Sequence, residues 1–485
     1  MDTGNELFAK INAWIDSHAE EMLDDLTRLI NTKSVLARPE TGAPYGRGAA
    51  DALDLSRKIM KKLGIETSVF EDCMAEGDIP GERGGEPELG LLVHVDTVDA
   101  DPSEWRSDPF RADIRDGGED CVGSAVYGRG STDNKGPAVA AMYALACARE
   151  IGQLKKGARI IVGSAEEIGC ADIARYLEKR SPPPLVIAPD AEYPLVNVEK
   201  GRFLMRFGGE WSSESENTDA VRIISIRGGG TDNIVPGAAE AVLCGTSADI
   251  ITPPALAFSE KTGADITVSD DPRGVIIKAY GKASHASRPD DGVNAQTALL
   301  AFLDALPLAD TNSARAARAL ARLFPHGDYH GAAMGLNMRD DISGTLTLSF
   351  DVLDMNETGF TASFDSRTPA IADTRDISGI AKAALEAADL RVTEISKTLC
   401  HHTPEDSALV QTLMSIYREY TGDTETAPLA LGGMTYVHGI PGGVAFGTQL
   451  PGENNRIHGR DEFIGVRELL LSAKMLARAI IELCG

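Results

Sequence analysis

The sequence predicts an α/β protein, because short apolar runs typical of buried strands alternate with stretches of helical periodicity. The strand-like runs lie at residues 91–97, 158–163 and 184–188, and the helical patterns at 14–29 and 137–148. Hydrophobic residues make up 43% of the chain and charged residues 25%, as in an ordinary globular protein. The length of 485 residues suits two to four domains of roughly 100–200 residues each.

The first helical stretch carries a dense group of acidic residues. Glu20, Glu21, Asp24 and Asp25 are interleaved with apolar residues at helical spacing. We expect these carboxylates on the solvated face of an opening helix.

Acidic residues also dominate the chain as a whole. Its 47 Lys and Arg stand against 73 Asp and Glu, which gives a formal net charge of −26. A surface of this kind repels phosphate backbones and anionic lipid headgroups, so nucleic-acid and membrane partners are disfavoured. No stretch approaches the about 20 apolar residues of a membrane span, and the first six residues do not form a secretory signal. The seven cysteines are scattered without a C-x-x-C pair, so we expect no disulfide framework or thiolate zinc site, and a reducing cytoplasm suits them.

The first strand-like run ends in two side chains that can bind a ligand. It reads Leu-Leu-Val-His-Val-Asp-Thr, with His94 and Asp96 two residues apart. Residues i and i+2 of a strand point to the same face, and open α/β sheets bind ligands at the carboxyl ends of their strands. From this pair alone, a ligand-binding pair and a hydrogen-bonded histidine at a strand end stay equally open.

A glycine-rich segment at 126–136 follows, ahead of the second helical stretch. It superficially resembles a phosphate-binding loop, but that loop requires G-x-x-x-x-G-K-[ST], and here Lys135 precedes Gly136. The mismatch disfavours nucleotide binding. It leaves one acid, Asp133, held in a tight turn.

Two further runs end in carboxylates. Glu166 and Glu167 follow the run at 158–163, and Asp190 follows the run at 184–188. Adjacent carboxylates repel each other unless a cation neutralises one of them. This oxygen-rich set with histidine and no thiolate suits zinc, manganese or cobalt, and two such ions sharing a carboxylate favour hydrolysis.

Five segments of the sequence form an ordered set: LLVHVDTV, YGRGSTDNKGP, IVGSAEEIG, APDAEYP and LGGMTYVHGIPGGVAFGTQLPGENNRIHGRDEF. Together they resemble the dinuclear zinc exopeptidases, and the PepV-type dipeptidases in particular. That family includes aminoacylase, carboxypeptidase G, succinyl-diaminopimelate desuccinylase and carnosinase. The resemblance implies a catalytic domain with a mixed, mostly parallel sheet, formed by 1–198 and 401–485. It also implies an inserted α+β ferredoxin-like lid, extended into two halves, at 199–400. Within that insert we expect strands at 222–227, 274–280, 345–351 and 359–365, and helices at 292–306, 313–324 and 376–389.

The resemblance assigns roles in the metal centre residue by residue. Asp96 would orient a metal-bound histidine, Glu166 would act as general base on a water bridging the ions, and the Asp133–Asn134 peptide would be cis. Asp133 would bridge the two ions. The implied ligands are His94 and Asp190 for one ion, Glu167 and His458 for the other, and Asp133 for both.

It also implies substrate-binding residues. His285 would stabilise the developing oxyanion, Asn233 would lie near the scissile bond, and Arg367 would grip the substrate carboxylate. Without the resemblance, a surface ion pair is the better explanation of Arg367. Thr435 belongs to a further substrate segment, where Met434 departs from the expected third glycine and leaves the pocket shape open.

These inferences predict a cytoplasmic metallodipeptidase, acting on ordinary dipeptides or on β-alanyl-histidine. The alternatives are removal of an acyl or succinyl group from an amino acid, and a non-catalytic binding homologue. The doubled lid favours a monomer, with a homodimer as the alternative. His18, His326 and His330 are expected at the surface or in loops, whereas roles for His401, His402 and His438 stay open.

Overall fold

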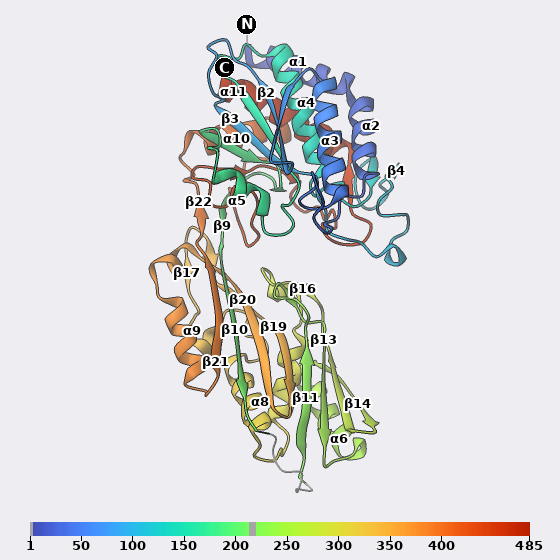
Figure 1. Ribbon diagram of the computed structural model, residues 1–485, viewed down its shortest axis with the longest axis vertical. Coiled ribbons are helices and arrows are strands. Elements are labelled where there is room, and N and C mark those ends of the chain that lie inside the picture. Colours follow the sequence, from blue (N-terminus) through green and yellow to red (C-terminus); the bar gives the residue numbers. More distant parts are fainter. Residues whose placement is uncertain (1–2, 213–219) are drawn as a thin grey trace. The chain divides into compact units, whose positions relative to one another are not determined.

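The computed structural model describes residues 3–212 and 220–485, which form two compact units. Unit 1 comprises Met1–Val198, His401–Leu429 and Met434–Gly485, and unit 2 comprises Glu199–Cys400 and Ala430–Gly433. The first helix, α1 (Thr3–Ser17), and the last, α11 (Val466–Cys484), both belong to unit 1 and contact each other (Figure 1). These bounds differ from the sequence expectation at Ala430–Gly433, which join unit 2 because Gly432 O accepts a hydrogen bond from Arg367 and Leu431 O accepts one from Lys200 N.

Unit 1 is an α/β unit. Its helices are α1 (Thr3–Ser17), α2 (Ala19–Ile30), α3 (Arg47–Lys62), α4 (Lys135–Ile151), α5 (Ala171–Leu177), α10 (Ala408–Thr421) and α11 (Val466–Cys484). Its strands are β1 (Glu66–Phe70), β2 (Met74–Ile79), β3 (Leu89–His94), β4 (Asp113–Asp116), β5 (Ser124–Tyr127), β6 (Ala158–Gly163), β7 (Leu185–Ala188), β8 (Ala191–Glu192), β9 (Val196–Glu199), β22 (His401–His402), β23 (Leu429–Leu431), β24 (Val444–Ala445), β25 (Thr448–Gln449) and β26 (Phe463–Gly465). By the bounds of the units, the last residue of β9 and the last two of β23 belong to unit 2.

The central sheet of unit 1 is mixed, as expected. Its order is β1-β2-β6-β3-β7-β24-β9-β22, with β23 paired to β9. The three strand-like runs of the sequence become β3, β6 and β7, which are neighbours, and β3 runs parallel to both of the others. Their carboxyl ends therefore reach the same edge of the sheet, where His94, Glu166 and Asp190 follow.

Packing explains which helices are apolar. Residues 135–148 of α4 are all buried, and α4 packs against α11 and α2 in the main core of the unit.

The expectation that Asp25 lies on a solvated helix face is wrong, since this residue of α2 is 1% exposed. Its carboxylate accepts hydrogen bonds from Tyr143 Oη (2.8 Å) and Lys62 Nζ (2.5 Å), partners on α4 and α3 that helical periodicity does not reveal.

A small second sheet positions two loops of unit 1. Strand β5 pairs with β26, so that Tyr127 lies opposite Phe463. The glycine-rich segment after β5 is therefore placed beside the segment that carries His458, although more than three hundred residues separate them in sequence.

Unit 2 is built on an eight-stranded sheet of order β14-β15-β13-β11-β19-β20-β10-β21, with antiparallel pairing at every junction. Its strands are β10 (Gly201–Glu210), β11 (Arg222–Gly228), β12 (Ile234–Val235), β13 (Ala238–Cys244), β14 (Asp265–Asp271), β15 (Gly274–Tyr280), β16 (Ser284–His285), β17 (Arg339–Asp340), β18 (Gly344–Thr345), β19 (Thr347–Asn356), β20 (Gly359–Thr368) and β21 (Arg391–Thr398). Its helices are α6 (Ala248–Thr262), α7 (Ala295–Asp304), α8 (Asn312–Leu323) and α9 (Ile377–Glu386).

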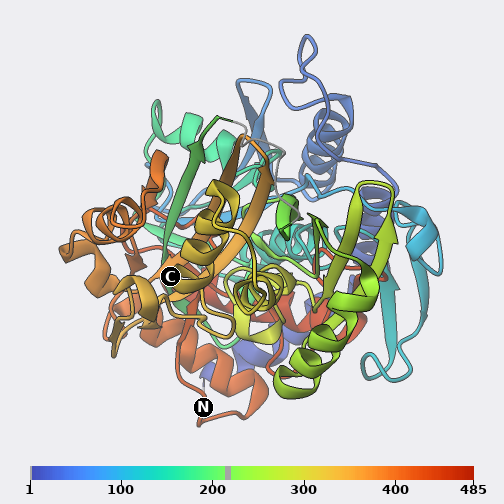
Figure 2. The same ribbon diagram turned by 90° about the horizontal axis from the view of Figure 1, so that it is seen from below.

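Alternation along the strands divides the two faces of this sheet. In β10, Phe203, Met205 and Phe207 enter the second hydrophobic core, which α7 and α8 also line. Arg202 and Arg206 occupy the alternate positions of the strand and project from the opposite face, as period-two geometry requires. Figure 2 shows α6, drawn in lime, alongside the strand β14 that follows it.

Two expectations about the whole chain are tested directly. None of the seven cysteines, which all lie within the described residues, takes part in a disulfide bond. Among the helices within residues 3–212 and 220–485, none has both the length and the apolar character needed to cross a membrane.

Candidate metal centre

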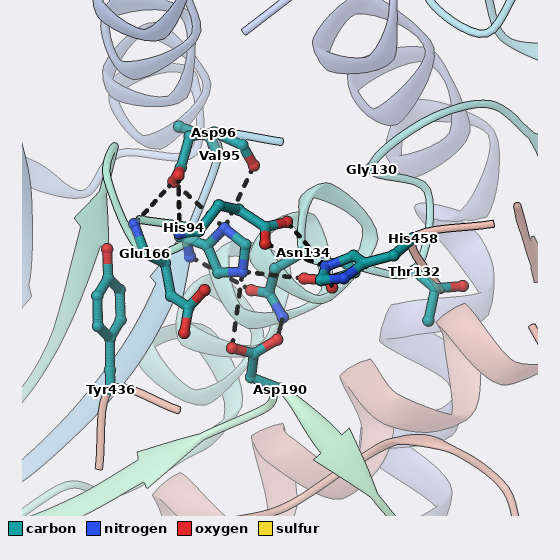
Figure 3. Close-up of polar contacts among 12 residues, drawn as sticks. His94, Val95, Asp96, Gly130, Thr132, Asn134, Glu166, Asp190, Tyr436 and His458 are labelled. Atoms are coloured by element: carbon teal, nitrogen blue, oxygen red, sulfur yellow. Dashed lines mark hydrogen bonds and ion pairs between the residues drawn. The ribbon is translucent and has the colours of Figure 1, made fainter. Parts of the chain in front are cut away.

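The expected ligand residues converge at the edge of the unit 1 sheet where β3, β6 and β7 end. His94 is the last residue of β3 and is fully buried, whereas His458 lies in the loop before β26 with its side chain 49% exposed. Figure 3 shows the two imidazoles approaching the same space from different segments.

Asp133 lies between the two histidines. Its Oδ1 is 3.0 Å from His94 Nε2, and its Oδ2 is 2.9 Å from His458 Nε2. One carboxylate thus faces two imidazoles with its two oxygens, which is the arrangement that a bridging ligand requires. The peptide bond that follows, Asp133–Asn134, is cis as expected.

Each histidine has a second carboxylate beside it. Asp190 Oδ2 is 3.6 Å from His94 Nε2, and Glu167 Oε2 is 3.0 Å from His458 Nε2. The donor atoms of His94, Asp133 and Glu167 all lie within 4.8 Å of one another, which is close enough to share a metal ion. The structure therefore brings together all five residues that the resemblance named as ligands.

Asp96 occupies a supporting position. Strand β3 ends two residues before it, yet Asp96 Oδ1 lies 3.3 Å from His94 Nδ1 on the side away from the other carboxylates. The same carboxylate accepts the amide N–H of Glu166 (3.2 Å) and that of Glu167 (3.1 Å). Asp96 therefore orients an imidazole and also fixes the turn that carries both glutamates.

The balance of charge in the cluster fits a divalent cation. Burial raises the pKa of Glu166 well above its ordinary value, and the neighbouring carboxylates Asp190 and Glu167 reinforce the rise while His94 opposes it. Burial and Asp133 likewise raise the pKa of Glu167 to about 7. With Asp96, five carboxylates thus surround two imidazoles, and divalent cations would offset most of this negative charge.

A buried nitrogen of His94 also fits metal binding. His94 Nε2 is buried and has no hydrogen-bond partner of good geometry among the described residues. Burial by itself lowers the pKa of His94, but Asp190, Asp133 and Asp96 raise it well above its ordinary value. An imidazole nitrogen aimed at two carboxylates in this way is a ready metal ligand.

Asn134 and Asp172 support the cluster, and the sequence did not single them out. Asn134 Nδ2 donates to Asp190 Oδ1 (2.7 Å), and Asn134 Oδ1 accepts the N–H of His94 (3.3 Å), as Figure 3 shows. Asp172 accepts the amides of Ser164 and Ala165, just ahead of Glu166. The only signal in the sequence was their position inside or beside the motifs.

Tyr436 completes the wall of the site. Its hydroxyl donates to Asp172 Oδ2 (2.7 Å), and its ring meets that of His94 edge-on at 6.1 Å. Thr435, the preceding residue, is 4% exposed and its Oγ1 accepts the N–H of Val437 (3.4 Å).

Unit 2 gathers the remaining expected substrate residues. Strand β12 pairs with β16 so that Ile234 lies opposite His285, and Asn233 O accepts the N–H of Ala286 (2.9 Å). His285 Nδ1 lies 2.6 Å from Ser287 Oγ and accepts the N–H of Ser287 (3.2 Å). In the tautomer in which Nδ1 accepts both contacts, a neutral imidazole carries its proton on Nε2 and can donate from there.

Arg367 is 4% exposed and is not a surface residue. Its Nε donates to Asp365 Oδ1 (2.8 Å) and its Nη1 donates to Gly432 O (2.7 Å), whereas Nη2 has no partner among the described residues. A Cβ added to Gly432 would lie 2.7 Å from Ser287 Cβ, so Arg367 and the His285 loop share a neighbourhood. The surface ion pair considered for Arg367 is wrong, because the partner Asp365 is itself fully buried.

The other histidines contact residues that are not in the proposed ligand set. His18 stacks on Trp14 with ring centroids 3.8 Å apart, His326 Nδ1 contacts Thr297 Oγ1 (2.9 Å) and His330 Nδ1 contacts Leu346 O (2.9 Å). The side chain of His401 is buried, with Nε2 2.9 Å from Gly443 O, and its ring centroid lies 6.2 Å from that of His438.

Comparison with known proteins gives a consistent result. The family described as Peptidase family M20/M25/M40 matches residues 90–482. The chain is 31% identical to "Putative dipeptidase YtjP" of Bacillus subtilis over 468 residues, covering 96% of this chain and 97% of that protein. It is 28% identical to Beta-Ala-Xaa dipeptidase of Lactobacillus delbrueckii over 477 residues, covering 96% and 97%. Human carnosine dipeptidase 1 shares the fold, with a TM-score of 0.57 at 14% identity, covering 99% of each chain.

Proposed function

Since this chain belongs to the peptidase family M20/M25/M40, we propose that it is a metal-dependent dipeptidase, hydrolysing dipeptides of the Xaa-Xaa or β-alanyl-histidine type. One observation carries this proposal: the two oxygens of Asp133 face two separate imidazoles at 3.0 and 2.9 Å. The dipeptidase names of the full-length relatives support the choice of substrate.

We assign the metal ligands as two sets that share one residue. His94, Asp133 and Asp190 would hold one divalent ion, and Asp133, Glu167 and His458 the other. Zinc suits oxygen and imidazole donors of this kind, and manganese or cobalt are the alternatives. Two bound ions would supply Lewis-acid polarisation of the scissile carbonyl and a lowered pKa for the attacking water.

Glu166 is assigned as the general base. It takes a proton from the attacking water and passes it to the leaving amine, which requires a carboxylate whose pKa lies near the working pH. The raised pKa of Glu166 in its buried, carboxylate-rich surroundings supports this role. Asp96 holds the Glu166 amide and so fixes the base relative to His94.

Unit 2, the expected lid, is assigned the groups that bind the dipeptide. His285, as a donor through Nε2, would stabilise the charge that develops on the scissile oxygen. Arg367 would use its remaining Nη2 for the substrate carboxylate, and Asp365 would hold the guanidinium in place. Asn233 of unit 2 and Thr435 of unit 1 are assigned to the remaining polar contacts.

A hydrolysis screen tests the proposed function. The metal-loaded protein is offered dipeptides, β-alanyl-histidine, tripeptides and N-acyl amino acids, with the chelated protein as control. We expect cleavage of dipeptides and none of the N-acyl amino acids. Cleavage of acyl or succinyl amino acids alone would replace the proposal with deacylation, and no cleavage by a protein that holds two ions would favour a binding homologue.

Arg367→Ala tests the contact with the substrate carboxylate. We expect kcat/KM to fall by about 10- to 100-fold on free dipeptides and little on C-terminally amidated ones, because a charge-assisted hydrogen bond is worth about 1.5–3 kcal/mol. The matched control is Arg227→Ala, which removes an exposed arginine of the same sheet. Equal losses on both substrates would show that Arg367 does not bind the carboxylate.

A further inference from the structure

The buried carboxylate of Glu462 lies outside the proposed ligand set and receives four N–H donors. Its Oε1 accepts the amides of Thr132 (3.0 Å) and Asp133 (3.1 Å). Its Oε2 accepts the amide of Gly130 (3.1 Å) and Arg129 Nη1 (2.8 Å). Glu462 is 0% exposed, so these contacts replace water completely.

These contacts explain why the glycine-rich segment resembles a phosphate-binding loop. Successive backbone amides in a tight turn form a concave anion site. Here the anion is a carboxylate of the same chain. The lysine of the segment, Lys135, does not face that anion but donates from Nζ to Thr32 O (2.9 Å).

The same carboxylate is tied to the segment that carries His458. Glu462 follows His458 by four residues, its backbone O accepts the N–H of Gly128 (2.9 Å), and Arg129 Nη2 donates to His458 O (3.2 Å). Arg456, His458 and Asp461 have φ of 57, 59 and 55°, in the left-handed region that non-glycine residues rarely adopt. Such a backbone persists only where neighbouring groups hold it, and the Arg129–Glu462 pair is among the groups that do so.

We infer that Glu462, paired with Arg129, is a positioning residue that holds the Asp133 segment and the His458 segment in register, so that both oxygens of Asp133 meet their imidazoles. The inference rests on the proposed function, because it takes Asp133 and His458 to be metal ligands. Asp133 and His458 lie on loops, and 2.9 Å separates their nearest atoms. A shift of either loop by an ångström would therefore separate the donor atoms of the second ion.

Glu462→Gln is the first test, made in the full-length protein. The amide keeps the shape of the side chain, but in either orientation its NH2 group faces two N–H donors, those of Gly130 and Arg129 or those of Thr132 and Asp133. We expect the affinity for the more weakly bound zinc ion, measured by competition with a chelator, to fall about 10- to 100-fold, as when groups supporting metal ligands are removed. Added zinc should restore part of kcat, and the visible spectrum of the cobalt-loaded protein should shift.

The matched control is Glu76→Gln. Glu76 is also a buried glutamate of unit 1, 3% exposed, which accepts hydrogen bonds from Tyr176 Oη (2.7 Å) and Ser68 Oγ (2.6 Å) and pairs with Arg159. It lies on β2, two strands from β3. We expect lower stability for this variant but a zinc affinity within about twofold of the wild type. Zinc affinities lowered equally in both variants would overturn the inference, since the effect would then be general destabilisation.

A second variant covers the case in which Glu462→Gln does not fold. Arg129→Lys keeps a positive charge beside Glu462 and the three backbone donors, but it loses the paired contacts to Glu462 and His458 O. We expect the same loss of the weaker zinc ion. Wild-type zinc affinity in this variant would overturn the inference.

Hydrogen exchange in the metal-free protein separates this inference from the proposed function. If the wild type neither binds two ions nor cleaves dipeptides, the proposed function fails. In the Arg129 and Glu462 variants, faster amide exchange in both segments, 128–134 and 456–462, supports the inference. Unchanged exchange in the His458 segment overturns it.

Discussion

Glu166 and Glu167 are adjacent in sequence but have different surroundings. Glu167 Oε2 contacts His458 Nε2 at 3.0 Å, whereas among the described residues Glu166 Oε1 accepts only a weak hydrogen bond from Cys170 Sγ (3.4 Å). A carboxylate with a weak partner is free to exchange a proton, and one that faces an imidazole is set to bind metal. The geometry thus supports the division of roles between two neighbouring acids.

We predict that Glu166→Gln keeps both metal ions and loses kcat by about 100- to 10,000-fold, the contribution of a positioned proton carrier. Because the change removes one of several repelling carboxylates, the variant should be no less stable than the wild type. Metal analysis, steady-state kinetics and thermal unfolding check this, with the exposed Glu178→Gln as control. Retained activity would contradict the assignment of the base.

We predict that His285→Ala lowers kcat by about 100- to 1,000-fold, the cost of removing one donor to an oxyanion. KM should change less, because the charge develops after binding. His330→Ala, a histidine of the same unit bound to Leu346 O, is the control for both constants. A KM effect with unchanged kcat would show that His285 binds substrate without stabilising the oxyanion.

At the scale of elements, the site is formed mainly by residues at or just after the ends of strands. Strand β6 ends at Gly163, which lies opposite Met74 on one side and His94 on the other. A side chain at Gly163 has no room, since an added Cβ would lie 1.9 Å from Tyr436 Oη and 2.5 Å from Asp172 Oδ2. Glycine at the strand end therefore allows Tyr436 and Asp172 to reach the turn that carries the glutamates.

At this scale, Gly163→Ala should destabilise unit 1 by about 1–3 kcal/mol, the usual cost of overpacking a close-packed site. It should also weaken activity, because displacing Tyr436 moves Asp172 and the turn it holds. Urea unfolding compared with Gly230→Ala, where an added Cβ meets nothing within 4 Å, provides the test. Equal stabilities of the two variants would show that Tyr436 moves aside without lowering the free energy of unfolding.

At the scale of the whole molecule, the two units differ in what stabilises them. The proposed metal ligands all belong to unit 1, whose segments 1–198 and 434–485 must come together to assemble them. Unit 2 has its own hydrophobic core and no proposed ligand. Bound metal should therefore stabilise the two units unequally.

Removing the metal should lower the stability of unit 1 and leave unit 2 unchanged. A ligand present at 100 times its Kd stabilises the state that binds it by about 2.7 kcal/mol. Hydrogen exchange with and without chelator should show faster exchange in β3 and β6 but not in β13 and β15. Equal effects on both units would contradict a metal centre confined to unit 1.

Assembly and location stay predictions from the sequence. We expect a monomer, which light scattering of the purified protein at several concentrations would test. A cytoplasmic location is expected from the scattered cysteines of the sequence and would be tested by fractionation of the source cells.

The sequence by itself determined the α/β class and the strands β3, β6 and β7, because each depends on local pattern. Its short motifs also predict the five residues that we propose as metal ligands. It misplaced Asp25 and did not single out Asn134, Asp172 or Glu462. Their roles depend on partners tens to hundreds of residues away, and no local pattern encodes such contacts. Only the tertiary structure decided that β5 and β26 pair, so that the Glu462 carboxylate occupies the anion-binding turn beside Asp133.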